Sequence, residues 1–128
     1  MKNKGFTLIE LLAVIVILAI IALIATPIIL GIIEDARKGA KENSAKLIVS
    51  TVEKAYASAY MLNDGKVPTK AAVMAQFNKD MDGAVWNGNE IKSTDGVVCE
   101  VTDTAGLSVI CKIGTDEVAS TSASMNLQ

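Results

Sequence analysis

The feature that most constrains this chain is a long apolar segment close to its N-terminus. Residues 11–33 form a run of 23 positions without a formal charge. A helix of about 20 apolar residues can cross the roughly 30 Å hydrocarbon core of a bilayer. The run is too long for a secretory signal, whose apolar part has about 7 to 15 residues and precedes a small-residue cleavage site. We therefore expect a membrane-spanning helix that remains on the mature protein.

Charged residues flank the start of this segment. Lys2 and Lys4 precede it, and Glu10 lies within its first turn. A carboxylate in lipid costs at least about 2.5 to 3.5 kcal/mol, so it usually has a partner. An uncleaved signal anchor would explain the lysines through the positive-inside rule, but it would leave Glu10 without a role. The processing point that fits this order of parts lies between Gly5 and Phe6, ahead of the apolar segment.

The junction around Gly5 resembles a known processing motif. Lys-Gly-Phe-Thr-Leu-Ile-Glu at residues 4–10, followed by the apolar run, is similar to the class III leader of type IV pilin and pseudopilin precursors. The resemblance implies that a membrane-embedded prepilin peptidase cleaves after Gly5 and methylates the new amino group of Phe6. It also implies a structural subunit that polymerises with copies of itself and with other pilins at a pilus assembly platform.

Phe6 and Glu10 are expected to act together in assembly. They lie four residues apart, which is one helical turn. After cleavage, Phe6 would carry a cationic amine at the edge of a low-dielectric environment, where opposite charges attract strongly although desolvation offsets much of the gain. Glu10 could neutralise its own terminus in the membrane or the terminus of a neighbouring subunit. The resemblance favours the second alternative, because that contact would admit subunits and set their axial register.

Pro27 lies within the apolar segment, where many pilins carry a proline. It removes a backbone donor and clashes with the preceding turn, so we expect a kink or a loosened helix over residues 22–26. In assembled pili of this family, the segment before the proline can unwind. Gly31 is a second candidate for a soft point.

Beyond residue 33 the helix is expected to continue with a different character. Residues 34–46 are dense in charge, and opposite pairs such as Glu34–Lys38 and Glu42–Lys46 each contribute tenths of a kcal/mol. An apolar stripe able to cover a small sheet then recurs at three- and four-residue steps. It consists of Leu47, Ile48, Thr51, Val52, Ala55, Tyr56, Ala59 and Leu62. A helix from Phe6 to Leu62 would be about 85 Å long, so its first half must lie in lipid or against copies of itself.

The remainder of the chain, residues 63–128, predicts a small α+β head. Thr69 is a candidate cap for a helix that reaches Phe77, and residues 116–128 predict a short edge strand or a loose tail. Strands are predicted at 84–86, 90–92, 97–102 and 107–113, with turns at 87–89 and 103–106. The domain organisation is a leader (1–5), a membrane and assembly helix (6–33), an amphipathic helical half (34–62) and the head (63–128).

Two cysteines fall on the clearest predicted hairpin. A register centred in the turn at residues 103–106 places Cys99 opposite Cys111 on the face that should press on the helical stripe. They could form a cross-strand disulfide if the head lies outside the membrane, where disulfides persist. The alternative is two small buried side chains that stay reduced.

Composition favours a structural protein over an enzyme. The chain has no histidine and two cysteines, which disfavours a metal site, and it contains no nucleophile or phosphate-loop motif. We therefore expect no catalytic residue and no cofactor. Two carboxylate pairs, Asp80 with Asp82 and Asp116 with Glu117, are expected to lie in solvated turns.

Net charge constrains the partners. Loss of Lys2 and Lys4 would change the formal charge from −2 to −4, which disfavours nucleic-acid binding by an isolated head. Nucleic-acid binding by the assembled filament remains open, through a local patch that would use Lys66, Lys70, Lys79 or Lys112.

The chain is expected to lie in the inner or plasma membrane, in contact with lipid, and to cross it once with an extracytoplasmic head. After assembly it is expected in an extracellular pilus or pseudopilus. The alternative function is a monomeric, membrane-anchored module whose head binds a ligand.

Overall fold

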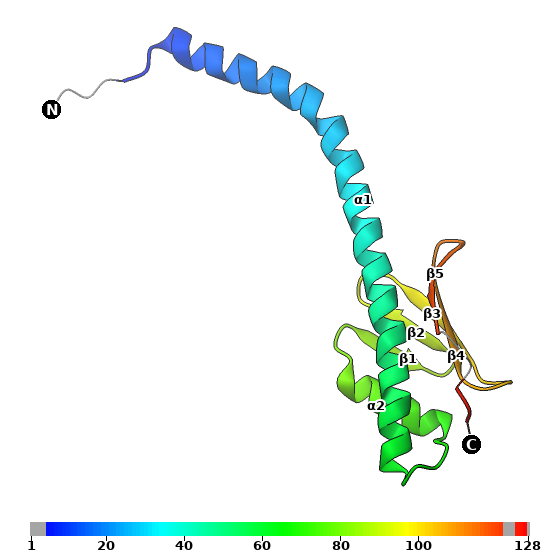
Figure 1. The fold of residues 1–128 in the computed structure, drawn as a ribbon. Coiled ribbons are helices and arrows are strands. Elements are labelled where there is room, and N and C mark those ends of the chain that lie inside the picture. Colours follow the sequence, from blue (N-terminus) through cyan, green and yellow to red (C-terminus); the bar gives the residue numbers. More distant parts are fainter. Residues whose placement is uncertain (1–4, 122–124, 128) are drawn as a thin grey trace. The chain divides into compact units, whose positions relative to one another are not determined.

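The structure is a computed structural model that describes residues 5–121 and 125–127. Its architecture is α+β, with one long N-terminal helix, a short second helix and a five-stranded antiparallel sheet (Figure 1). The chain divides into two compact units, Met1–Arg37 and Lys38–Gln128. Helix α1 (Leu8–Leu62) contributes residues to both.

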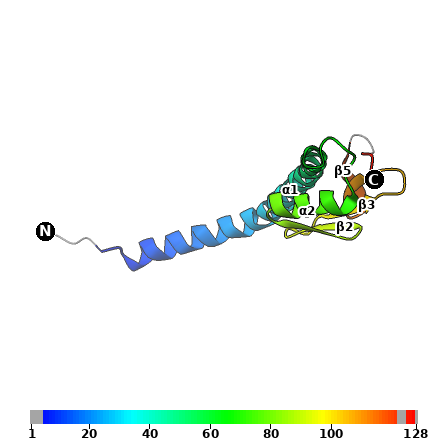
Figure 2. The same cartoon turned by 90° about the horizontal axis from the view of Figure 1, so that it is seen from below.

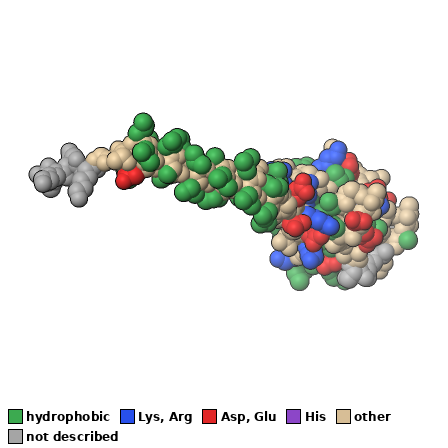
Figure 3. Space-filling model, turned by 90° about the horizontal axis from the view of Figure 1, so that it is seen from above, with side chains coloured by type: hydrophobic (Ala, Val, Ile, Leu, Met, Phe, Trp, Pro, Cys, Tyr) green, Lys and Arg blue, Asp and Glu red, His purple; other side chains and the backbone are tan. Residues whose placement is uncertain are grey.

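The first unit consists mainly of the apolar part of α1. The helix begins at Leu8, two residues later than predicted, and it continues through Pro27 without interruption. Every large apolar side chain from Phe6 to Ile33 is at least 40% exposed. Figure 3 shows this surface as an almost continuous cover of hydrophobic side chains. The helix is long and apolar enough to cross a membrane, since an 18-residue window has a mean hydropathy of 3.2 with none of it buried.

In the second unit, α1 buries one face against the sheet. The face consists of Ala45, Ile48, Val49, Thr51, Val52, Ala55 and Ala59. The predicted stripe was wrong at its two ends, because Leu47 is 55% exposed and Leu62 is 77% exposed. Ala45 and Val49 lie on the buried side instead, since a helical face of limited width cannot include every apolar position. The predicted pairs Glu34–Lys38 and Glu42–Lys46 are also absent from the ion pairs found among the described residues, as their small energies allow.

Helix α2 (Lys70–Asp80) begins where the sequence predicted and extends three residues further. The hydroxyl of Thr69 accepts a hydrogen bond from the Ala72 amide at 3.2 Å, which caps the helix. Its buried side chains are Val73 and Phe77, and the Phe77 ring meets the edge of Trp86 at a centroid distance of 5.9 Å. Figure 2 shows α2 and the end of α1 on the same side of the sheet, so both helices cover one face.

The sheet is a simple meander whose strands follow in chain order. Its strands are β1 (Ala84–Asn87), β2 (Glu90–Ser93), β3 (Val98–Thr102), β4 (Ser108–Ile113) and β5 (Asp116–Ser120). The predicted strands are confirmed, and the segment after residue 115 forms an edge strand over its first five positions. Residues 122–124 and 128 of the predicted tail lie outside the described residues.

The two cysteines form a disulfide at the centre of the buried sheet face. The predicted register holds, because Cys99 pairs with Cys111 and Val101 pairs with Val109. Both sulfurs are joined, and both residues are fully buried. Cross-strand pairing extends this inward row in both directions, through Ile91 to Trp86 on one side and to Ala119 on the other.

A polar contact ties the β2–β3 turn to α1. Ser44 donates its hydroxyl to the Asp95 carboxylate at 2.5 Å, and Ser93 donates to the other oxygen of the same carboxylate. The hydrogen bond from Ser44, with that from Ser93, holds the pKa of Asp95 below its ordinary value. The turn is therefore attached to the helix by a charge-assisted contact that the sequence pattern did not reveal.

The outer edge of β1 is covered by a side chain. Asn78 of α2 accepts a hydrogen bond from the Trp86 amide at 2.8 Å and donates one to the Trp86 carbonyl at 2.9 Å. One amide group thus satisfies both backbone groups that Trp86 presents at this edge.

Candidate processing and assembly site

The junction between Gly5 and Phe6 is open on the structure. A side chain built at Gly5 would meet no atom within 4 Å, and Phe6 is 85% exposed. Neither residue belongs to α1, which begins at Leu8, so the peptide bond between them lies outside regular secondary structure. Lys2 and Lys4, the charged part of the predicted leader, lie outside the described residues.

The start of α1 is closed by a reciprocal cap between Thr7 and Glu10. The Glu10 amide donates to the Thr7 hydroxyl at 3.2 Å, and the Thr7 amide donates to the Glu10 carboxylate at 3.3 Å. The Leu11 amide donates to the Thr7 carbonyl at 3.1 Å and begins the helical ladder. This arrangement is a capping box, in which two otherwise unpaired backbone donors are satisfied together.

Thr7 was missed as a site residue, although the sequence contained its signal. A Thr followed three residues later by Glu and then by an apolar run is the usual pattern of a capping box. The cap gives Glu10 a local partner, so a simple anchor no longer leaves this carboxylate without a role. It also explains why α1 starts two residues later than predicted, since the capping residue lies before the first helical turn.

Pro27 does not break α1 in the single chain. Thr26 donates its hydroxyl to the Ala22 carbonyl at 2.5 Å, one turn before the proline. Such a bond back to the preceding turn often bends a helix. The carbonyl that lacks its usual donor because of Pro27 is that of Leu23, four residues before the proline. The kink or loosening of the helix at residues 22–26 stays a prediction.

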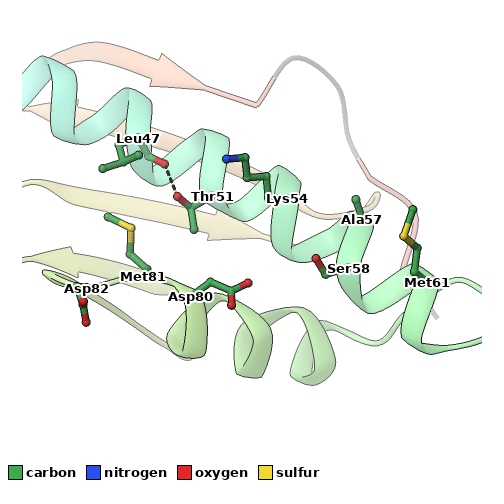
Figure 4. A pocket seen from close by; sticks show the side chains of 9 residues that line it. All are labelled: Leu47, Thr51, Lys54, Ala57, Ser58, Met61, Asp80, Met81 and Asp82. Atoms are coloured by element: carbon green, nitrogen blue, oxygen red, sulfur yellow. Dashed lines mark hydrogen bonds between the residues drawn. The ribbon is translucent and has the colours of Figure 1, made fainter.

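Three of the four carboxylates that were expected in solvated turns belong to a helix or a strand. Asp80 is the last residue of α2, whereas Asp116 and Glu117 belong to the edge strand β5. Asp80 and Asp82 line a groove of about 680 Å³ beside α1 (Figure 4). Among the described residues, no group of three or more His, Cys, Asp or Glu side chains could hold a metal ion.

Two of the four lysines considered for a nucleic-acid patch are engaged in ion pairs. Lys70 contacts Asp103 at 2.9 Å and also donates to Asn89, which joins α2 to two loops at one end of the sheet. The hydrogen bond and the charge of Lys70 lower the pKa of the Asp103 carboxyl. Lys112 lies 3.9 Å from Glu100 on the neighbouring strand.

Comparison with known families gives a match at the N-terminus. Residues 1–26 match the family described as the prokaryotic N-terminal methylation motif. No curated protein matches the chain. The matched range includes the open junction, the capping box and most of the exposed apolar helix. Residues 1–26 of this chain are therefore an N-terminal methylation motif, the class III signal of type IV pilin and pseudopilin precursors.

Proposed function

We propose that this chain is the precursor of a structural subunit of a type IV pilus or pseudopilus. In this proposal a prepilin peptidase cleaves between Gly5 and Phe6 and methylates the amino group of Phe6. The mature chain then remains inserted in the membrane until it is assembled. The filament, and not the single subunit, then performs adhesion, motility, DNA uptake or secretion. The observation that carries the proposal is the methylation motif at residues 1–26, because it coincides with the exposed start of α1.

The exposed apolar surface of the first unit supports the proposal, because such a surface has to be covered by lipid or by other subunits. Soluble monomers rarely expose contiguous apolar patches larger than a few hundred Å². Here the large apolar side chains from Phe6 to Ile33 are all at least 40% exposed. A bilayer covers this surface before assembly, and neighbouring helices cover it in a filament.

Glu10 has two successive roles in this proposal. In the precursor its carboxylate completes the capping box with Thr7. After cleavage, the cationic amine of Phe6 in a neighbouring subunit provides a charged partner, which attracts the carboxylate more strongly than a neutral amide does. If Glu10 exchanges the Thr7 amide for the Phe6 amine of a neighbouring subunit, only a cleaved chain can supply that amine. Entry into the filament would then depend on processing.

Two substitutions at Glu10 separate the charge from the cap. Glu10→Gln keeps an oxygen that can accept from the Thr7 amide but removes the negative charge, whereas Glu10→Ala removes both. We expect both variants to be processed and inserted in the membrane yet to form few filaments. Normal filaments from Glu10→Gln would contradict an assembly role for the charge, and Thr7→Val provides the matched variant that weakens the cap alone.

The alternative function is a monomeric, membrane-anchored module. The capping box favours this alternative, because a capping role for Glu10 needs no neighbouring subunit. Intact-mass measurement and N-terminal sequencing of the protein from its own cells distinguish the two functions. A chain that begins at methylated Phe6 supports the filament subunit. A chain that still begins at Met1 supports the anchor.

A further inference from the structure

A groove in the second unit lies between α1 and the end of α2. One wall is formed by the α1 residues Leu47, Thr51, Lys54, Ala57, Ser58 and Met61, and the other by Asp80, Met81 and Asp82. Figure 4 shows the two acidic residues on the α2 side and Lys54 on the α1 side. The groove has a volume of about 680 Å³.

The charges on the two walls are not paired with each other. Asp80 accepts a hydrogen bond from Gln76 at 2.8 Å, but no ion pair within the described part of the chain includes Asp80, Asp82 or Lys54. The groove thus presents two negative charges along one wall and one positive charge along the other. A complementary occupant carries a cation for the first wall and an anion for the second.

The chain itself contains a helical stretch with this arrangement. Glu34 lies three residues before Arg37 and four before Lys38, so these side chains share one side of α1. All three are exposed, and none takes part in an ion pair among the described residues. The stretch also follows directly on Ile33, which is 40% exposed and adds an apolar side chain next to these charges.

We propose that the groove between α1 and α2 receives the Glu34–Lys38 stretch of α1 from a second copy of this chain. In this contact, the helix of one copy lies across the groove of the other, so that its one charged side meets both walls. Arg37 and Lys38 then face Asp80 and Asp82, while Glu34 faces Lys54. The inference rests on the proposed filament function and names the surface through which the second unit of one subunit contacts its neighbour. Electrostatic complementarity of this kind fixes register and excludes wrong alignments more than it adds affinity.

Charge reversal tests the contact in the full-length chain, expressed in cells that assemble the wild type. Asp80→Lys/Asp82→Lys and Arg37→Glu/Lys38→Glu each place like charges across the interface. We expect each double variant to lower the yield of sheared filaments about tenfold, which corresponds to roughly 1.4 kcal/mol. The quadruple variant restores opposite charges and should recover most of the yield. Wild-type yield from both double variants, or a quadruple variant no better than either, would overturn the proposal.

A matched control is available on the edge strand. Asp116→Lys/Glu117→Lys makes the same change in net charge as Asp80→Lys/Asp82→Lys but away from the groove, and we expect it to assemble normally. Folding of each variant is checked by the fluorescence of Trp86, which is buried in the core. If a reversal variant misfolds, the contact is tested by oxidative cross-linking of an Asp82→Cys subunit with an Arg37→Cys subunit. Linked pairs are expected, and their absence from wild-type-like filaments would exclude the contact.

Failure of this inference and failure of the proposed function are distinguishable. Filaments that need the Glu10 charge but tolerate every reversal would retain the proposed function and reject the groove contact. A chain that is never cleaved after Gly5 and forms no filament would reject the proposed function itself.

Discussion

Reduction of the Cys99–Cys111 disulfide should weaken the second unit by an amount that the chain length between the cysteines sets. The two residues are 12 positions apart in the sequence. In the chain-entropy treatment, closing a loop of this size lowers the entropy of the unfolded chain enough to contribute about 2.8 kcal/mol at 25 °C. For a domain of this size we expect the melting temperature to fall by about 10 to 20 °C on reduction.

The single tryptophan makes this measurement selective for the second unit. Trp86 is the only tryptophan, it is 1% exposed, and its row on the sheet contains the disulfide. Urea unfolding of the detergent-solubilised full chain is followed by Trp86 fluorescence with and without reductant. With a slope of about 1.3 kcal/mol per molar urea, the midpoint should fall by about 2 M on reduction.

The variant Cys99→Ala/Cys111→Ala is the control for this experiment. It should unfold at a low urea concentration that reductant does not change, because it contains no disulfide to break. Coincident unfolding curves for the wild type with and without reductant would refute the loop-entropy reasoning. Such a result would mean that the unfolded chain is already restricted between these positions, or that the thiols are free in the native protein.

Three further substitutions test other parts of the structure. Gly5→Glu should leave uncleaved precursor, visible as an unchanged intact mass, because the resemblance implies a small residue at the cleavage site; normal cleavage would count against it. Asp95→Ala should lower stability by about 1 kcal/mol at pH 7 through loss of the bond from Ser44. Since the folded pKa of Asp95 is lowered, this difference should shrink as the pH falls below about 4, and a pH-independent difference would contradict it. Thr69→Ala should cost about 1 kcal/mol through loss of the α2 cap, measured by the same urea unfolding, and no change would mean that solvent caps the helix equally well.

The positions of most helices and strands could be predicted from capping residues and turn residues. Thr69 marked the start of α2, and the turn residues between Thr102 and Leu107 set the hairpin register that brings the two cysteines together. These signals are strong because a helix cap and a tight turn depend on residues a few positions apart. The start of α1 at Leu8 was misplaced only because the capping role of Thr7 was overlooked.

The contacts between distant segments could not be predicted. Ser44 and Asp95 are 51 positions apart, and Lys70 and Asp103 are 33 positions apart. Whether such polar groups meet depends on how the helices lie over the sheet, which no local pattern determines. The same limit applied to Asp80 and Asp82, whose position opposite Lys54 became visible only once α1 and α2 were placed together.

The amide of Asn78 has a consequence for how copies of this chain can join. An open sheet edge invites another strand, and repeated pairing of that kind leads to irreversible cross-β aggregates. At the β1 edge, the Asn78 side chain pairs with the backbone of Trp86 as a neighbouring strand would. At the opposite edge, β5 carries the charged residues Asp116 and Glu117, and its pairing with β4 contains a bulge. Both edges of the sheet are therefore protected against pairing with a strand of another copy, which leaves the helices as the surfaces for the assembly proposed above.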